Sequence, residues 1–352
     1  MDPVTILVGG IALVVVLVGI ILYPAFKIIP FVYGASRLRA AKSKFLSDKE
    51  IKDLAHKGYK EAILIIEERK NTELLKLIDS DFSEELVQKE LRRKYLYYLK
   101  KIIRYTPSNY KKFFYLLKSR EGFEYMLTAI RSKTNKYYKR HVVSDLFIEV
   151  KGAKFLTDVE TMTIDELIQS FRTTQYGKVI DKFADDIKKG ELQAFEQAIN
   201  AEYYAKLRNA TMGNSVLKQL VNRLIDIHNI NQATYLLENY THFMNGGSFD
   251  KVRLDNLKNT SSIKEVVSAL QGTYVEKYIA DAYSPKDIVQ GLYKSLKDFG
   301  IKISKTEPLG LSQFVSFYIL GRNEFKNLRI VLKLINEKFE PKDIEGHIIW
   351  LH

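Results

Sequence analysis

A helical pattern that recurs three times constrains the fold of this 352-residue chain more than any other feature. Each copy opens with apolar residues at helical spacing. About 60–70 residues later it carries an acidic residue, with a second polar residue three places on. The openings are Ile51–Ala55, Ile164–Ile168 and Ile263–Val267, and the pairs are Glu121 and Glu124, Asp226 and Asn229, and Glu324 and Asn327. Three copies of one helical unit predict a body with pseudo-threefold symmetry, which is typical of a scaffold more than of a catalyst.

The pattern divides the chain into four segments. Residues 1–30 are predicted to form an N-terminal anchor and a proline connector, and the three helical-bundle repeats are predicted to span residues 31–150, 151–250 and 251–352. Proline is rare, with seven residues in the chain, and long proline-free stretches are rich in Leu, Ile, Lys, Glu and Ala. This composition favours helices throughout, so the predicted fold class is all-α.

Capping residues indicate where helices begin in each repeat. A capping box, in which two side chains satisfy free N–H groups at a helix start, is expected at Ser47 with Glu50, Thr163 with Glu166, and Ser262 with Glu265. Longer helices are expected at Leu86–Ile103, Leu192–Leu207 and Ile288–Phe299, and a loop at Ile301–Gly310. Each repeat is therefore expected to be a small cluster of helices.

The N-terminal stretch Val4–Tyr23 contains 20 residues and no charge. A helix of this length measures about 30 Å, the thickness of a bilayer core, so we predict a transmembrane helix. A buried core helix and a cleaved signal peptide are the alternatives, although the first residues lack the positive charge of a signal peptide. A basic cluster follows, consisting of Arg37, Arg39, Lys42 and Lys44. Because this cluster is close to the predicted anchor and to lipid head groups, we expect it to face the membrane. By the positive-inside tendency, we expect the bulk of the chain to lie on the cytoplasmic side of the cell membrane.

A second basic stretch covers Gln88–Arg140. It holds sixteen Lys and Arg against three acidic residues, so its net charge of +13 equals that of the whole chain. Such a stretch is expected to face something negative: anionic lipid head groups, an acidic protein surface or nucleic acid. The interleaved tyrosines would suit single-stranded nucleic acid, but the chain has no recognised RNA motif. We therefore expect no nucleic-acid partner. A membrane-bound nucleic-acid binder stays as an alternative hypothesis, ranked below the two functions described at the end of this section.

The sequence contains no established catalytic pattern. Cysteine is absent, which excludes disulfides, thiolate zinc sites and cysteine nucleophiles. A phosphate loop, a dinucleotide-binding glycine pattern and a nucleophile elbow are also absent. His228 could bind a metal ion, but a histidine on a helix is far more often a satisfied structural residue. The chain is therefore predicted to be no enzyme, with no cofactor, no metal site and no small-molecule substrate.

The polar pairs and three tyrosines are the candidate functional residues of the body. The spacing of three places puts both members of a pair on one face of a helix. A ring of such pairs could grip a central shaft; alternatively, the pairs cap neighbouring helices or bind backbone groups between packed helices. Tyr59, Tyr176 and Tyr274 follow the three opening helices. They are expected to pack between helices with the hydroxyl bonded to a neighbour, rather than to contact a ligand.

Three motifs resemble a known family. The segment Tyr33–Leu46 is similar to the Y-x-x-A-R-x-R-A-x-K-S-x-L-L signature of the C subunits of archaeal A-type ATP synthases, which are similar to the d subunit of the V-type ATPase. Thr173–Gly177 and Asn323–Arg329 resemble the T-x-Y and E-x-x-N-L-R elements of that family. The resemblance covers residues 31–350, nearly everything after the predicted anchor.

The resemblance implies a funnel-shaped, non-catalytic component of the central stalk. Such a component sits on the cytoplasmic face of the rotating proteolipid ring and receives the lower end of the central shaft, built from D-type and F-type subunits. It transmits torque between proton or sodium flow and ATP chemistry elsewhere. The predicted anchor departs from the family pattern, and such a helix could lie at the centre of the ring. The alternative is a membrane-anchored basic helical-repeat adaptor that recruits an acidic partner.

Overall fold

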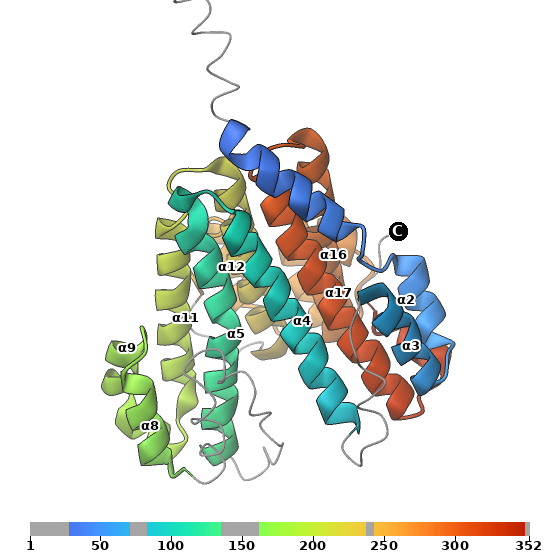
Figure 1. Cartoon of the computed structure of the whole chain (residues 1–352). Coiled ribbons are helices and arrows are strands. Elements are labelled where there is room, and N and C mark those ends of the chain that lie inside the picture. The colour runs from blue at the N-terminus through green and yellow to red at the C-terminus, as the bar shows by residue number, and fades with distance from the viewer. Residues whose placement is uncertain (1–27, 71–82, 135–161, 237–242, 349–352) are drawn as a thin grey trace, which may run out of the picture.

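The computed structural model describes residues 28–70, 83–134, 162–236 and 243–348 (Figure 1). Every regular element in these ranges is a helix, which confirms the predicted all-α class. None of the helices in these ranges is both long and apolar enough to cross a bilayer. The predicted anchor, Val4–Tyr23, lies outside the described residues.

A helix at residues 28–42 comes first in the described chain and is followed by two short helices. These are α2 (Asp48–Ala55) and α3 (Tyr59–Lys70). The remaining helices are α4 (Ser83–Tyr105), α5 (Ser108–Thr134), α8 (Ile164–Arg172), α9 (Gly177–Lys182), α10 (Ala184–Lys189), α11 (Leu192–Asn209), α12 (Ser215–Leu236), α13 (Lys251–Lys258), α14 (Ile263–Ala269), α15 (Glu276–Ile279), α16 (Pro285–Thr306), α17 (Ser312–Asn336) and α18 (Pro341–Glu345).

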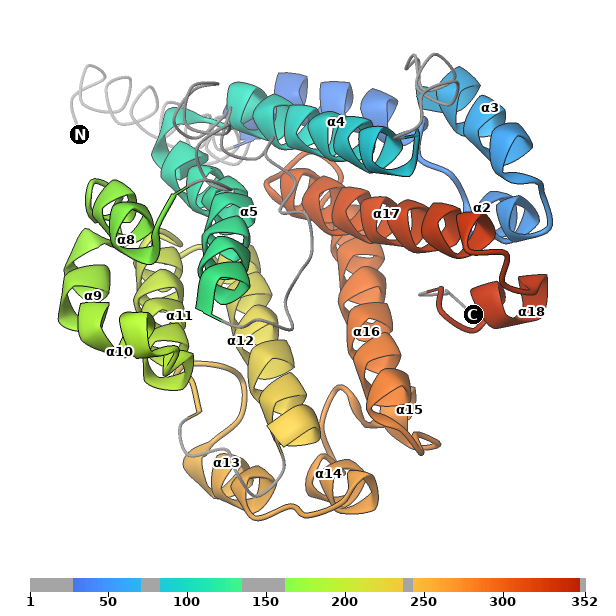
Figure 2. The same cartoon turned by 90° about the horizontal axis from the view of Figure 1, so that it is seen from below.

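Three long helical hairpins form the frame of the molecule: α4 with α5, α11 with α12, and α16 with α17. Their connections, at residues 106–107, 210–214 and 307–311, gather at one end, and the helix at residues 28–42 lies across that end (Figure 1). We call this end the apex. The long helices diverge from the apex, and short helices surround the opposite end, the base (Figure 2).

The hairpins contain the longer helices expected from the sequence, since α4, α11 and α16 include the three predicted ranges. The homology and pseudo-threefold symmetry of the three units stay a prediction, as do their boundaries. The loop predicted at Ile301–Gly310 is wrong in its first half, because α16 continues to Thr306. Ile303 is buried on this last stretch, so packing extends the helix until Pro308 prevents its continuation.

The helix starts follow the predicted capping residues. Ser47 and Glu50 form a complete capping box at α2, and so do Thr163 and Glu166 at α8. At α14 the Ser262 side chain accepts from the Glu265 N–H, but the Glu265 carboxylate accepts from the N–H of Ser261, one residue earlier than a capping box requires. Local sequence thus sets where these helices begin.

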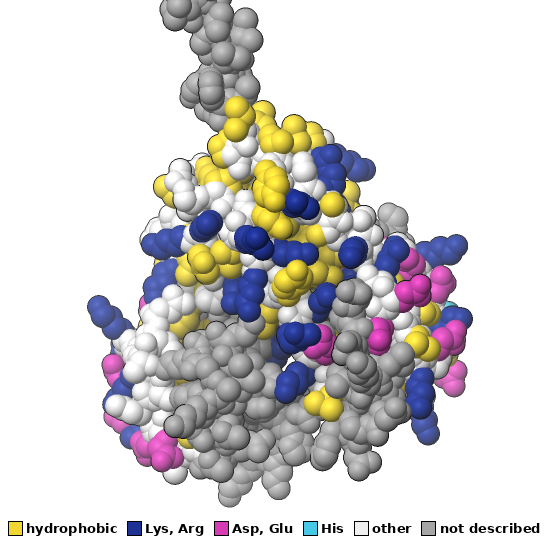
Figure 3. Space-filling view, viewed as in Figure 1, with side chains coloured by type: hydrophobic (Ala, Val, Ile, Leu, Met, Phe, Trp, Pro, Cys, Tyr) yellow, Lys and Arg dark blue, Asp and Glu magenta, His cyan; other side chains and the backbone are white. Residues whose placement is uncertain are grey.

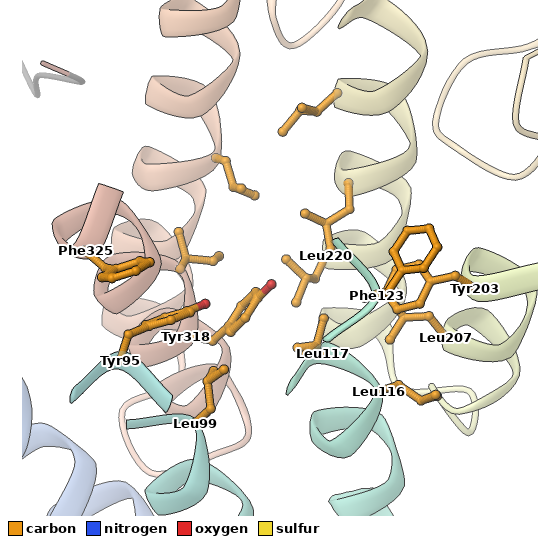
Figure 4. Packing of buried hydrophobic residues seen from close by; sticks show 14 of the residues in the cluster. Tyr95, Leu99, Leu116, Leu117, Phe123, Tyr203, Leu207, Leu220, Tyr318 and Phe325 are labelled. Carbon is orange, nitrogen blue, oxygen red and sulfur yellow. The ribbon is translucent and has the colours of Figure 1, made fainter. Parts of the chain in front are cut away.

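One continuous hydrophobic core joins the hairpins, and α17 is its central element. This helix packs along α16 and α4 and also contacts α2, α3, α12 and α18. Its Phe325 stacks on Tyr95 of α4 with the ring centroids 4.7 Å apart. Tyr318 lies two turns earlier on α17, and its side chain points toward Leu220 of α12 and Leu117 of α5 (Figure 4).

The apex helix also approaches α17 closely. A Cβ added at Gly34 would lie 2.6 Å from both the Phe314 ring and the carbonyl oxygen of Tyr105. Only glycine leaves room for this contact, which fixes the helix at residues 28–42 against the ends of the first and third hairpins.

Candidate partner-binding surfaces

The predicted basic cluster lies on the helix that covers the apex and just beyond its end; it consists of Arg37, Arg39, Lys42 and Lys44. Arg37 is exposed. Arg39 Nη2 donates to the carbonyl oxygen of Pro308 at 2.7 Å, which ties this helix to the α16–α17 connection. Burial lowers the pKa of Lys42, and the positive charges of Arg39 and Lys305 lower it further. Positive charge is therefore concentrated along this helix.

Apolar side chains are exposed at the apex beside this cluster. They belong to the apex helix and to two of the hairpin connections: Ile28, Ile29, Val32, Tyr33, Met212 and Leu309. Figure 3 shows hydrophobic side chains at the apex, with a band of Lys and Arg beneath them. An exposed apolar patch rimmed by polar residues is typical of a surface that meets a protein partner or a membrane.

Glu324 and Asn327 are buried in α17. Glu324 Oε1 accepts from the Leu46 N–H at 2.6 Å and forms an ion pair with Lys70 of α3. The Lys70 ammonium also donates to the Lys44 carbonyl oxygen at 2.9 Å. Since the Lys70 and Glu324 side chains are 3% and 6% exposed, the ion pair is buried. It connects α17 to α3 and to the segment between the apex helix and α2.

Asp226 and Asn229 of α12 are also buried, and they hold the segment before α13. The Asn229 side chain donates to the Met244 carbonyl at 2.9 Å and accepts from the Met244 N–H at 2.8 Å. Asp226 Oδ1 accepts from the Ser248 N–H at 2.9 Å, and Oδ2 accepts from the Tyr274 hydroxyl at 3.1 Å. Burial raises the pKa of Asp226 to about 6, although these hydrogen bonds favour its charged form.

Glu121 and Glu124 of α5 are only partly buried. Glu121 pairs with Arg92 of α4 at 3.7 Å, and Glu124 forms an ion pair with Arg120, one turn earlier. The structure does not bring the three predicted pairs to one place. Only one of their six residues, Glu124, lines the cavity that lies between the three hairpins. Contact of these pairs with a shaft stays a prediction.

The three predicted tyrosines pack between helices. The Tyr176 ring lies 5.6 Å from that of Phe123 on α5. The Tyr274 hydroxyl donates to Asp226, and the Arg223 guanidinium lies over its ring at 4.0 Å. Tyr59 begins α3, and burial raises its pKa to about 12; its hydroxyl has no hydrogen-bond partner among the described residues.

A central cavity of about 200 Å³ lies between the three hairpins. Five of the six long helices contribute to it: Arg120 and Glu124 come from α5, Tyr203 and Tyr204 from α11, His228 and Asn231 from α12, Tyr293 from α16, and Tyr318 and Arg322 from α17. Aromatic rings thus surround a small group of charged side chains. The described residues hold no group of three His, Cys, Asp or Glu side chains that could bind a metal ion.

Two positive side chains of α17 lie at or beside the central cavity: Arg322 lines it, and Lys326 contacts its Tyr293. The ammonium of Lys326, one turn after Arg322 on α17, lies 3.6 Å from the centroid of the Tyr293 ring. This charge lowers the pKa of Tyr293 to about 8. On α12, burial lowers the pKa of His228 to about 4, and Arg120 adds to the effect. His228 is therefore neutral at pH 7, and the arginines and Lys326 carry the positive charge.

The sequence of this chain matches a known protein family over a range that includes most of the apex helix and all residues of the central cavity. The model of the ATP synthase (C/AC39) subunit family matches residues 35–347. The chain belongs to this family. The family resemblance indicated by the sequence motifs is confirmed.

Individual members of the C/AC39 family match along most of their length. The C subunit of the A-type ATP synthase of Methanocaldococcus jannaschii is 22% identical over 350 residues, which cover 92% of this chain and 87% of the relative. The C subunit of the Desulfurococcus sp. (strain SY) enzyme is 25% identical over 338 residues, 91% of each chain. That of Pyrococcus horikoshii is 20% identical over 342 residues, 91% of this chain and 90% of the relative.

The motifs of this C/AC39 family member did not indicate which residues line the central cavity, since Glu124 alone of the predicted polar pairs is among them. A signal for it exists on α17, where Arg322, Lys326 and Arg329 recur at positions i, i+4 and i+7. Most other residues of this helix are buried. A cationic stripe along a helix that is otherwise buried could have indicated a charged interior surface.

Proposed function

We propose that this chain is a non-catalytic central-stalk component of a rotary A-type ATP synthase. It couples the membrane proteolipid ring to the central shaft and transmits torque for ion-driven ATP synthesis or hydrolysis. The observation that carries the proposal is the family match over residues 35–347, supported by C subunits of A-type ATP synthases that match along about nine-tenths of their length. A match of this extent concerns a whole polypeptide and not a single shared domain.

The two ends of the molecule suit two different partners. The apex carries exposed apolar residues and the basic cluster, and the described chain begins there, at Ile28. The uncharged stretch Val4–Tyr23 would therefore enter the membrane from the apex, so we assign the proteolipid ring and anionic lipid to this end. The shaft, with its D-type and F-type subunits, is assigned to the base, where the hairpins diverge.

The densely packed helices supply the stiffness that coupling requires. A continuous core joins all three hairpins, and close-packed protein interiors deform little under load. A body of this kind can pass rotation from one end to the other without a chemical step of its own.

Charge reversal at the apex tests the proposal. A variant with Arg37, Arg39, Lys42 and Lys44 replaced by Glu should detach from isolated proteolipid rings, because it repels anionic lipid and any acidic ring surface. Co-sedimentation of the full chain with rings in detergent measures the loss. The matched control replaces four exposed lysines away from the apex, Lys178, Lys251, Lys258 and Lys264.

Two outcomes would contradict the proposal. If the apex variant stays on the ring as well as the control variant does, the basic cluster does not face the ring. The second outcome is that the wild-type chain purifies from native membranes with another acidic protein and with neither proteolipid nor shaft subunits. The chain would then be better explained as a membrane-anchored adaptor than as a stalk component.

A further inference from the structure

We propose that a cleft between α12 and α16 binds a small organic molecule, whose single carboxylate is held by Arg223. The cleft has a volume of about 1090 Å³, and none of its lining residues also lines the central cavity. Its walls come from α12, α16 and the segment around α15, which packs along α16 (Figure 2). The inference goes beyond the proposed function and does not depend on it.

The first argument is the way in which Arg223 is held in this cleft. Arg223 is half-buried, and its guanidinium carbon lies 4.0 Å from the centroid of the Tyr274 ring and 4.5 Å from that of Phe299. Contacts with ring faces restrict the orientation of a guanidinium but use none of its N–H groups. Within the described ranges this guanidinium forms neither a hydrogen bond nor an ion pair. It is therefore a pre-oriented fork of donors that matches the two oxygens of a carboxylate.

No carboxylate of the described chain occupies this fork. Asp226 lies only three places further along α12, but its oxygens accept from the Ser248 N–H and the Tyr274 hydroxyl instead. Burial lowers the pKa of Arg223, because the charged guanidinium loses contact with water. A carboxylate from a ligand would offset this cost and satisfy the N–H groups at the same time.

The second argument is the charge around the cleft, which favours a ligand with one negative charge. The carboxylates that line the cleft already accept hydrogen bonds: Glu276 from the Gly272 N–H at 2.8 Å, Asp298 from the Tyr278 hydroxyl at 2.8 Å, and Glu307 from the Ser312 N–H at 3.3 Å. Three cations, Arg223, Lys277 and Lys302, balance these three anions. A single added charge can pair with Arg223, whereas a doubly charged phosphate would be repelled by the three carboxylates.

The third argument is the size and the lining of the cleft. A cleft of about 1000 Å³ with aromatic walls and a few polar groups is typical of a site for a small organic molecule, and a bare ion would leave most of it empty. Phe299, Val216 and Ile303 supply apolar surface. Ser295, one turn before Phe299 on α16, also lines the cleft, and its buried hydroxyl has no partner in the described part of the chain. That hydroxyl needs an acceptor, which an oxygen of the ligand would supply.

Binding of simple probes to the full chain in detergent provides the test. Ligand-observed NMR measures the dissociation constant of benzoate, which has one carboxylate and one apolar ring. We expect a Kd of about 1 mM or below, which is within the range for a ligand of this size. Phenyl phosphate at about pH 7.5 is mostly a dianion and should bind at least about fivefold more weakly, and inorganic phosphate more weakly still.

Two variants connect this binding to the cleft. Arg223→Lys retains the charge but not the fork, so it should weaken benzoate binding by about 10-fold or more. Ser295→Ala removes one donor and should weaken binding by about 2- to 10-fold. The matched control, Lys258→Gln, removes an exposed charge on α13 and should leave the affinity unchanged. Thermal melts of each variant show whether it is folded, and Ser295→Ala carries the test if Arg223→Lys is not.

Three results would overturn the inference. The first is a wild-type chain that binds benzoate with a Kd above about 10 mM, or no more than detergent alone does. The second is folded variants at Arg223 and Ser295 that bind benzoate as tightly as the Lys258→Gln control. The third is tighter binding of phenyl phosphate than of benzoate, which would make the cleft a phosphate site. None of these results affects the proposed stalk function, which the ring and shaft experiments test separately.

Discussion

The buried ion pair between Lys70 and Glu324 connects two distant parts of the chain, and its removal should be costly. Both side chains are almost fully buried, and each has one further hydrogen bond to the backbone, at the Lys44 carbonyl and the Leu46 N–H. The Lys70→Met variant retains the volume of the side chain but leaves the carboxylate buried without its cation. Breaking one partner of a buried pair typically costs about 3–5 kcal/mol.

The expected loss can be measured in two ways. Urea unfolding followed by circular dichroism should show a decrease of about 4 kcal/mol in the free energy of unfolding. For a chain of 352 residues, this corresponds to a decrease of about 5 °C in the melting temperature, from the average entropy of unfolding per residue. Glu324→Gln, which can still accept from the Leu46 N–H, should lose a similar amount because it leaves the Lys70 ammonium buried without its anion.

The double variant Lys70→Met with Glu324→Leu is the control for this reasoning. It removes both charges, so it should recover much of the lost stability, since apolar residues of similar volume often replace a buried pair at little cost. Single variants within about 1 kcal/mol of the wild type would refute the argument, because exposed pairs contribute no more than that.

Three further predictions concern local structure. Asp226→Asn removes a carboxyl whose pKa is raised to about 6 in the folded chain; the stability it contributes is complete below its unfolded pKa and is lost as pH rises through 6. Relative to this variant, the wild type should therefore lose about 3 kcal/mol between about pH 4 and pH 7, and parallel urea-unfolding profiles would contradict this. Gly34→Ala should cost about 1–3 kcal/mol because its Cβ would clash with Phe314, whereas the control Gly58→Ala, with no atom within 4 Å of the added Cβ, should be neutral or slightly stabilising in thermal melts. Ser47→Ala should cost about 1 kcal/mol through loss of the α2 cap, and a variant as stable as the wild type would show that the cap is not needed.

Local features of this fold could be predicted from the sequence. The capping boxes at Ser47 and Thr163 follow from residue types three places apart, because both partners lie within one helical turn. The hairpin helices α4, α11 and α16 follow from long stretches without helix breakers. The boundary of α16 is harder to predict, since a residue such as Ile303 extends the helix only because other helices bury it.

The contacts of the polar pairs and the residues that line the central cavity could not be predicted in the same way. Glu324 meets Lys70 and Leu46 across more than 250 residues of chain, and spacing along one helix carries no information about such a partner. The cavity is lined from five helices, so neither Arg120 nor Arg322 stands out until the hairpins are placed side by side. The family signature near Arg37 located the chain in a known class, but it did not indicate where charge collects inside it.

The position of α17 has a mechanical consequence. Arg322 lines the central cavity and Glu324 holds Lys70, and two residues along a helix correspond to about 200° around its axis. Opposite sides of α17 therefore face the central cavity and the residues that attach the apex helix and α3 to the body of the molecule. A small rotation of that rod, produced from within, must shift the anchorage of the apex helix at the same moment, with no relay of side chains in between.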